Sequence, residues 1–235
     1  MALLDDVIAA AGGVQRWSKL KRFTVHFSMS GALLSQVGHP TGFKDMVAEG
    51  CTLTQLVRFS GFSDSGRYGL YQPSLVTIES ADGSILGQWS DPLGSFRANA
   101  LLRPWEDMHL IFFCGYSLWM YLTTPFVLTL PDVSIKELSI WHEHGQEWRR
   151  LQATFPSALV THSPQQTFYF DSAGLQRRVD HEIFGSKVAQ YTWAHQTFGG
   201  IVVPTLGRSL RLQSDGTASS GAALLDIEIF DAAFE

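Results

Sequence analysis

Trp105, Asp107 and His109 place an aromatic ring, a carboxylate and an imidazole at the start of the longest apolar run, which extends from Pro104 to Pro125. On a helix that begins near Pro104, Trp105 and His109 are four residues apart and share a face. A carboxylate that orients an imidazole at the mouth of an apolar pocket could perform general acid–base catalysis. An acidic residue also stabilises the positive end of a helix dipole, so a structural role is the alternative. Asp107 and His109 are therefore our first catalytic candidates.

His162 is the third catalytic candidate, and it precedes an aromatic segment together with two glutamines. Aromatic side chains often line concave apolar sites, although packing in the core of a large sheet is the simpler alternative. Among the candidates for ligand contact, Tyr191, Trp193 and His195 alternate along one predicted strand and would share one of its faces. The complete set of predicted ligand-binding residues is Trp105, Tyr116, Trp119, Tyr169, Tyr191, Trp193 and His195.

Metal and cofactor chemistry have little support in the sequence. His142 and His144 alternate and could hold a metal from one face of a strand, but no third ligand follows at short spacing. The chain contains no P-loop, dinucleotide fingerprint, nucleophile elbow or metalloprotease motif. We predict no metal and no cofactor.

The composition is typical of a globular protein with a substantial core. Of 235 residues, 45% are hydrophobic and 17% are charged, and the net charge is −5. The short basic run from Lys19 to Arg22 is too small to predict a nucleic-acid or anionic membrane surface. The acidic residues near Pro104 also shorten the apolar run below the roughly 18 residues of a spanning helix.

Cys51 and Cys114 are the two cysteines, and their spacing supports neither a zinc ribbon nor a redox pair. The sequence alone leaves a single disulfide between them open. Asp5 and Asp6 stand where a secretory signal peptide would carry basic residues. We therefore expect a cytoplasmic protein with two free thiols.

The periodicity predicts a mainly β domain spanning residues 1–235. An amphipathic helix over residues 3–20 is interrupted at Gly12 and Gly13, and a second helix spans residues 104–124. Elsewhere turn signals recur about every ten residues, and Asp82-Gly83 is typical of a β-hairpin. We expect a curled antiparallel sheet or incomplete barrel of about ten strands, with the helices plugging its open side. The predicted strands cover residues 23–30, 53–59, 66–71, 75–79, 84–89, 135–142, 147–155, 167–170, 175–184, 188–198, 201–203, 208–213 and 224–230.

The order Phe170-Asp171, Gly174 to Arg178 and Gly200 to Pro204 resembles the second half of LolA-type lipoprotein-carrier domains. That resemblance implies an incomplete antiparallel barrel with helices in its open hydrophobic side. Lipoprotein sorting is not implied, because it requires an export signal that we do not identify. The same half-barrel is used by a cytoplasmic, cofactor-free enzyme of violacein pigment biosynthesis. The segments PWEDMHL, YLTTPF and THSPQQTFYF also resemble those of an uncharacterised family of soluble bacterial proteins.

These patterns lead to two main hypotheses. The first is a protein that binds a hydrophobic or aromatic small molecule in the cavity of a β half-barrel. The second is a cofactor-independent cyclase or isomerase of a natural-product pathway that uses an acid–base pair in that cavity. A structural protein that binds a partner through an open sheet edge is a third possibility, and the sequence leaves a homodimer open.

Overall fold

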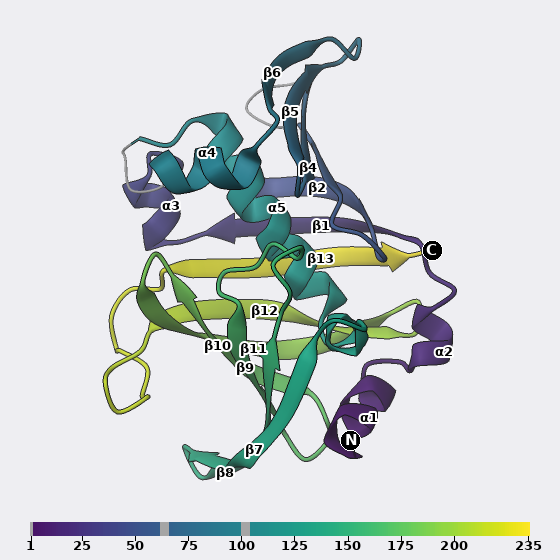
Figure 1. Ribbon diagram of the computed structural model, residues 1–235, viewed down its shortest axis with the longest axis vertical. Coiled ribbons are helices and arrows are strands. Elements are labelled where there is room, and N and C mark those ends of the chain that lie inside the picture. Colours follow the sequence, from purple (N-terminus) through teal and green to yellow (C-terminus); the bar gives the residue numbers. More distant parts are fainter. Residues whose placement is uncertain (1, 62–65, 100–103) are drawn as a thin grey trace.

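A single antiparallel sheet of 13 strands forms the frame of the protein (Figure 1). The computed structural model describes residues 2–61, 66–99 and 104–235. The strand order is β6-β5-β4-β3-β2-β1-β13-β12-β11-β10-β9-β8-β7, so β6 and β7 are the two edges and the sheet is not closed. The first half of the sheet consists of β1 (Arg22–Ser30), β2 (Phe43–Cys51), β3 (Val57–Ser60), β4 (Arg67–Gln72), β5 (Leu75–Ser80) and β6 (Ile85–Trp89). The second half consists of β7 (Ser134–Glu143), β8 (Gln146–Thr154), β9 (Gln165–Phe170), β10 (Gln176–Ile183), β11 (Ser186–Phe198), β12 (Ile201–Arg211) and β13 (Leu225–Phe234).

The two halves meet where β1 pairs with β13, in the middle of the sheet. In β1 the apolar residues Phe23, Val25, Phe27 and Met29 are buried, and the residues between them are more exposed. This alternation gives each strand one face toward the core, as its period of two requires. The sheet curls around that face, which we call the concave face.

Helix α5 (Asp107–Thr123) crosses the concave face and links the two halves of the sheet (Figure 1). Nearly all its side chains are buried, as expected of a helix that is apolar all round. Two glycines let it approach the sheet closely. A Cβ atom added to Gly115 would lie 2.4 Å from Cγ of Tyr71 on β4, and one added to Gly207 on β12 would lie 3.0 Å from the Tyr121 ring. The predicted helical plug is therefore part of the tightly packed core.

Shorter helices close the ends of the sheet, and they include elements that the sequence did not predict. The predicted break at Gly12 and Gly13 separates α1 from α2. Residues 92–99 form a helix that the sequence did not predict, because Phe96 packs against Trp105 and Phe112 and so fixes that segment on α5. These helices are α1 (Ala2–Ala10), α2 (Val14–Trp17), α3 (Ala32–Gln36), α4 (Pro92–Asn99) and the 3-10 helix η1 (Phe126–Thr129).

The fold class is confirmed, while several boundaries differ from the prediction. Helix α5 begins at Asp107 and not near Pro104, because the Glu106 side chain and the His109 ring form a reciprocal cap at its start. Residues 201–213 were expected to form two strands, but β12 continues unbroken from Ile201 to Arg211. Strand β2 was not recognised.

Two further properties bear on the expectations above. Cys51 and Cys114 are both free thiols, and Cys114 is fully buried on α5. Within the described part of the chain, no helix has the length and apolar character needed to cross a membrane.

Candidate functional site

Three cavities follow one another along α5, between the helix and the concave face. The outer cavity has a volume of about 130 Å³ and lies among α4, α5, residues 160–162 and the turn between β10 and β11. The middle cavity has a volume of about 40 Å³ and lies beneath residues 117–124. The end cavity has a volume of about 20 Å³ and reaches α1. Consecutive cavities share lining residues: His162 for the first two, and Tyr121, Thr124 and Gln176 for the last two.

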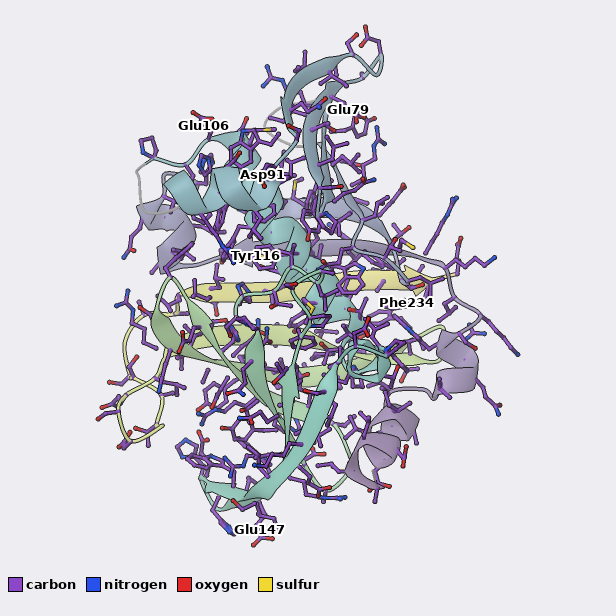
Figure 2. All side chains as sticks on the ribbon, in the orientation of Figure 1. Glu79, Asp91, Glu106, Tyr116, Glu147 and Phe234 are labelled. Carbon is purple, nitrogen blue, oxygen red and sulfur yellow. The ribbon has the colours of Figure 1, made fainter. Side chains whose placement is uncertain are left out.

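His162 separates the outer cavity from the middle cavity. Its Nδ1 lies 3.1 Å from the hydroxyl of Tyr116, and its Nε2 lies 3.3 Å from the hydroxyl of Ser117. The Ser117 hydroxyl donates its only proton to the Phe113 carbonyl, at 2.6 Å, so it can only accept from His162. The network therefore assigns the proton of His162 to Nε2, and Tyr116 donates to Nδ1. Figure 2 shows Tyr116 on α5 near the centre of the molecule.

His181 stacks on His162, with ring centroids 4.6 Å apart and planes only 11° apart. It comes from β10, where it faces the middle cavity together with Val179. Burial lowers the pKa of His181 to about 4, and burial followed by the nearby His181 lowers the pKa of His162 well below its ordinary value. Both imidazoles are neutral near pH 7. Neither ring nitrogen of His181 has a hydrogen-bond partner among the described residues.

Gln176 and His195 continue the polar lining toward the end cavity. The side-chain oxygen of Gln176 and both ring nitrogens of His195 are buried without a partner in the described part of the protein. Burial lowers the pKa of His195, and the nearby Arg177 lowers it further. Tyr121 is satisfied, because its hydroxyl donates to the Pro204 carbonyl at 3.0 Å. The row thus combines apolar walls with uncharged polar groups that lack partners.

The structure places Asp107 and His109 away from this row. His109 accepts a hydrogen bond from the backbone N–H of Glu106 at 3.2 Å and contributes to the cap of α5. Its ring packs against Trp89 and Trp105, and burial lowers its pKa. Neither Asp107 nor His109 lines the three cavities. Their catalytic roles stay predictions, because none of the three cavities lies beside them.

Trp105 and Trp119 are core residues that position α5. Trp105 packs against Phe96 and Phe113, and His39 forms a 2.7 Å hydrogen bond with its carbonyl oxygen. Trp119 donates its indole N–H to the Cys51 carbonyl at 2.8 Å and so ties the helix to the end of β2. Of the predicted ligand-contacting residues, Tyr116 lines the outer cavity and His195 lines the end cavity.

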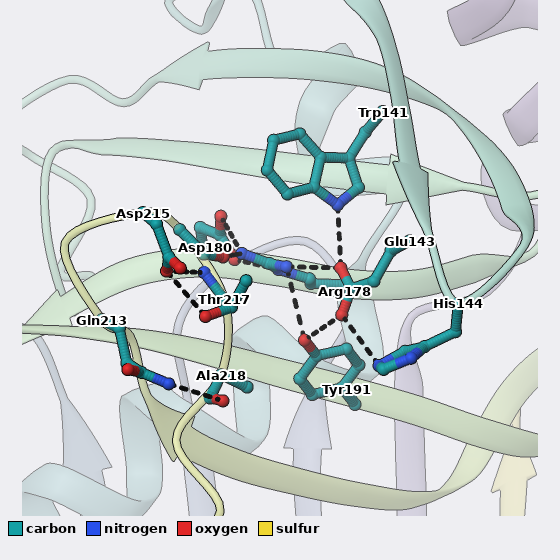
Figure 3. A network of polar contacts seen from close by, with 11 residues as sticks. Trp141, Glu143, His144, Arg178, Asp180, Tyr191, Gln213, Asp215, Thr217 and Ala218 are labelled. Carbon is teal, nitrogen blue, oxygen red and sulfur yellow. Dashed lines mark hydrogen bonds and ion pairs between the residues drawn. The ribbon is translucent and has the colours of Figure 1, made fainter.

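Tyr169 on β9 and Tyr191 on β11 lie on the opposite face of the sheet, on either side of Arg178. Figure 3 shows Tyr191 next to Arg178. The Arg178 side chain is almost completely buried. It forms two hydrogen bonds with Asp180 at 2.6 and 2.9 Å, and another with Glu143 at 2.6 Å. Burial would raise the pKa of Glu143, but hydrogen bonds from Tyr191 and other groups hold it below its usual value.

This ion network fastens the loop between β12 and β13 to the sheet, because Arg178 also donates to the Gly216 carbonyl at 2.9 Å. The expectation that Tyr191, Trp193 and His195 share a face is wrong for His195. Ala194 has a φ of 54°, which interrupts the alternation and turns His195 toward the end cavity. Trp193 is 37% exposed.

His142 and His144 lie at the exposed end of the β7–β8 hairpin. They contact Glu147 and Glu143 at 3.5 and 3.7 Å, respectively. Within residues 2–61, 66–99 and 104–235, no group of three potential metal ligands comes together.

The middle cavity contains residues that sequence reasoning did not select, namely Ser117, Gln166, Gln176, His181 and Gln190. A signal for some of them exists in the strands. Gln166 and Phe168 alternate on β9, and Phe168, Val179 and Gln190 lie opposite one another across β9, β10 and β11. Polar residues at positions of an otherwise apolar face would have indicated the site, but only the strand register reveals that they meet.

The sequence matches no protein-family model, and no curated protein matches it significantly. Similar solved structures include a LolA superfamily protein from Nitrosomonas europaea, with 11% identity, coverage of 97% of this chain and 92% of that chain, and a TM-score of 0.53. A DUF1329 family protein from Desulfovibrio piger has 12% identity, coverage of 100% and 92%, and a TM-score of 0.55. A domain named as an outer membrane lipoprotein-sorting protein from Vibrio parahaemolyticus has 11% identity, coverage of 100% and 91%, and a TM-score of 0.54. The chain therefore has a LolA-like fold, as the resemblance implied.

Proposed function

We propose that this protein binds a compact hydrophobic or aromatic small molecule in the cavities between α5 and the concave face of the sheet. The observation that carries this proposal is the row of three hollows along α5, in which neighbouring hollows share lining residues. Protein cores normally leave few voids larger than a water molecule. Here the hollows follow α5, and the outer and middle ones meet at His162.

The outer cavity supports an aromatic occupant. Phe96, Phe112, Tyr116 and Phe184 contribute its rings, and Leu93 and Ile183 contribute aliphatic surface. Its volume of about 130 Å³ is close to that of an engineered cavity of about 150 Å³ that holds benzene. One aromatic ring is therefore the matching size, and a larger ligand requires movement of α4 or the neighbouring loops.

The LolA-like fold is consistent with this location. One similar structure is named for the sorting of outer membrane lipoproteins, and that name describes the other protein only. The cavities described above are far smaller than a lipoprotein, so we propose a small ligand and not that cargo. No observation in the cavities favours the cyclase or isomerase alternative.

Isothermal titration calorimetry with toluene tests the proposal. A contribution of about 0.7 kcal/mol per heavy atom gives the probe a Kd of roughly 0.2 mM. Leu93→Trp introduces a larger ring into the outer cavity and should weaken toluene binding at least tenfold, on the order of 1.4 kcal/mol. Leu86→Trp is the matched control, because Leu86 is 54% exposed on β6 and lines none of the three cavities.

Retained binding by Leu86→Trp together with lost binding by Leu93→Trp supports the outer cavity as the site. Native mass spectrometry of the gently purified protein adds an independent test, since a bound apolar molecule should appear as a discrete added mass. If toluene fails to bind the wild type and no added mass is found, the proposed function is wrong.

A further inference from the structure

Most of the buried side-chain atoms without hydrogen-bond partners in the described residues gather along the three cavities. They are the side-chain oxygen of Gln176 and both ring nitrogens of His181 and His195. Two others, the Tyr71 hydroxyl and Nε2 of His109, line none of the three cavities. The unpaired polar atoms and the cavities therefore occur in the same part of the molecule.

An unpaired buried polar group costs about 1–3 kcal/mol, so groups of this kind normally have partners. His162 offers no free atom, because Tyr116 and Ser117 occupy its two nitrogens. A neutral His181 still offers one donor and one acceptor, and Gln176 offers an acceptor. A partner that both donates and accepts hydrogen bonds would therefore satisfy His181 and Gln176.

In the described part of the chain, the absence of charged residues from the middle and end cavities restricts the charge of the ligand. Among the described residues, no Asp, Glu, Lys or Arg lines the middle or the end cavity. An ion buried there would lose its hydration without gaining an opposite charge, which costs several kcal/mol. A carboxylate has no proton to donate, so it would leave the acceptor of His181 unsatisfied and face the oxygen of Gln176.

Resting on the function proposed above, we propose that the ligand is an aromatic or aliphatic molecule bearing an uncharged group that both donates and accepts hydrogen bonds. A primary amide and an alcohol belong to this class. The apolar part occupies the outer cavity, and the polar group passes His162 into the middle cavity to meet His181 and Gln176. Arg97 is the cation at the outer cavity, and it offers the competing site for an anion.

Toluene, benzamide and benzoate separate these cases, because they share one ring and differ in the attached group. In calorimetric titrations near neutral pH, benzamide should bind the wild type at least about tenfold more tightly than benzoate, since a site built for hydrogen bonds rejects a mismatched analogue. Equal or tighter binding of benzoate overturns the inference while leaving the proposed function intact. If none of the three compounds binds and native mass spectrometry finds no added mass, the proposed function and this inference are both wrong.

Variants locate the polar group. His181→Leu should weaken benzamide binding about tenfold and leave toluene binding unchanged, and Gln176→Leu provides a second version should the first fold poorly. His144→Leu is the matched control, because the His144 side chain is 88% exposed on the β7–β8 hairpin. Arg97→Gln should weaken benzoate binding more than benzamide binding. Unchanged benzamide affinity in both cavity variants, or a greater loss for benzamide than for benzoate in Arg97→Gln, overturns the assignment.

Discussion

Replacing His181 with leucine should reduce the acid sensitivity of this protein. Burial lowers the pKa of His181 from 6.5 to about 4, so the unfolded chain binds more protons than the folded protein between these values. The stabilising contribution of a neutral His181 is fully present above about pH 6.5 and is lost as the pH falls toward 4. His181 is nearly inaccessible to solvent, so screening by water is small.

The magnitude follows from the two pKa values. With pKa values of 6.5 and about 4, His181 lowers the free energy of unfolding by about 2 kcal/mol between about pH 7.5 and pH 5. The loss grows to about 3 kcal/mol near pH 4. His162 acts in the same direction, because burial also lowers its pKa, but it is retained in His181→Leu.

Urea denaturation followed by circular dichroism measures this effect at several pH values, with linear extrapolation to water. The required quantity is the difference between wild type and His181→Leu in the stability lost between about pH 7.5 and pH 5. His144→Leu should keep the wild-type pH dependence, because that side chain is 88% exposed. If His181→Leu loses as much stability as wild type, His181 is not a buried neutral imidazole and the description of the middle cavity is wrong.

Three further substitutions test the packing that surrounds the site. Arg178→Met should destabilise the protein by about 3–5 kcal/mol in urea denaturation, because Asp180 and Glu143 lose their buried cation. Gly115→Ala should cost about 1–3 kcal/mol in the same assay, because the added methyl group meets the Tyr71 ring. Trp119→Phe should cost about 1–3 kcal/mol, because it leaves the Cys51 carbonyl without its indole donor. A loss below about 0.5 kcal/mol in any of them would contradict the contact concerned.

The sequence predicts the strands of this protein well where one face is buried and the other is not. Phe23 to Ser30 alternates regularly and forms β1, and Asp82-Gly83 marks the turn between β5 and β6. Helix α4 was missed because its stability comes from Phe96 packing on α5, which is a tertiary contact without a local signal. Local sequence patterns thus predict the strands with one buried face, whereas a short helix such as α4 forms only because of its tertiary contacts.

The candidate site was harder to predict because its residues come from distant segments. His162 was selected, but His181, which stacks on it, was not. Its strand neighbour Asp180 faces the other side of β10, where it binds Arg178, while His181 lines the middle cavity. The stacking of the two histidines depends on a connection between β8 and β9 that follows no periodic pattern.

The polar atoms that face α5 from the sheet without partners among the described residues cost stability, and this cost is an argument for a site. Ser117, Tyr121 and Thr124 follow one side of an otherwise apolar helix and face His181 and Gln176. Apolar residues of similar volume in place of His181 and Gln176 would pack as well and would leave no unpaired ring nitrogen or amide oxygen there. Sequences tend to be locally consistent with their fold, and departures concentrate where function requires them. The cavities leave space unfilled and leave polar atoms without hydrogen-bond partners in the described part of the chain. A ligand with a neutral polar group would fill that space and pair those atoms.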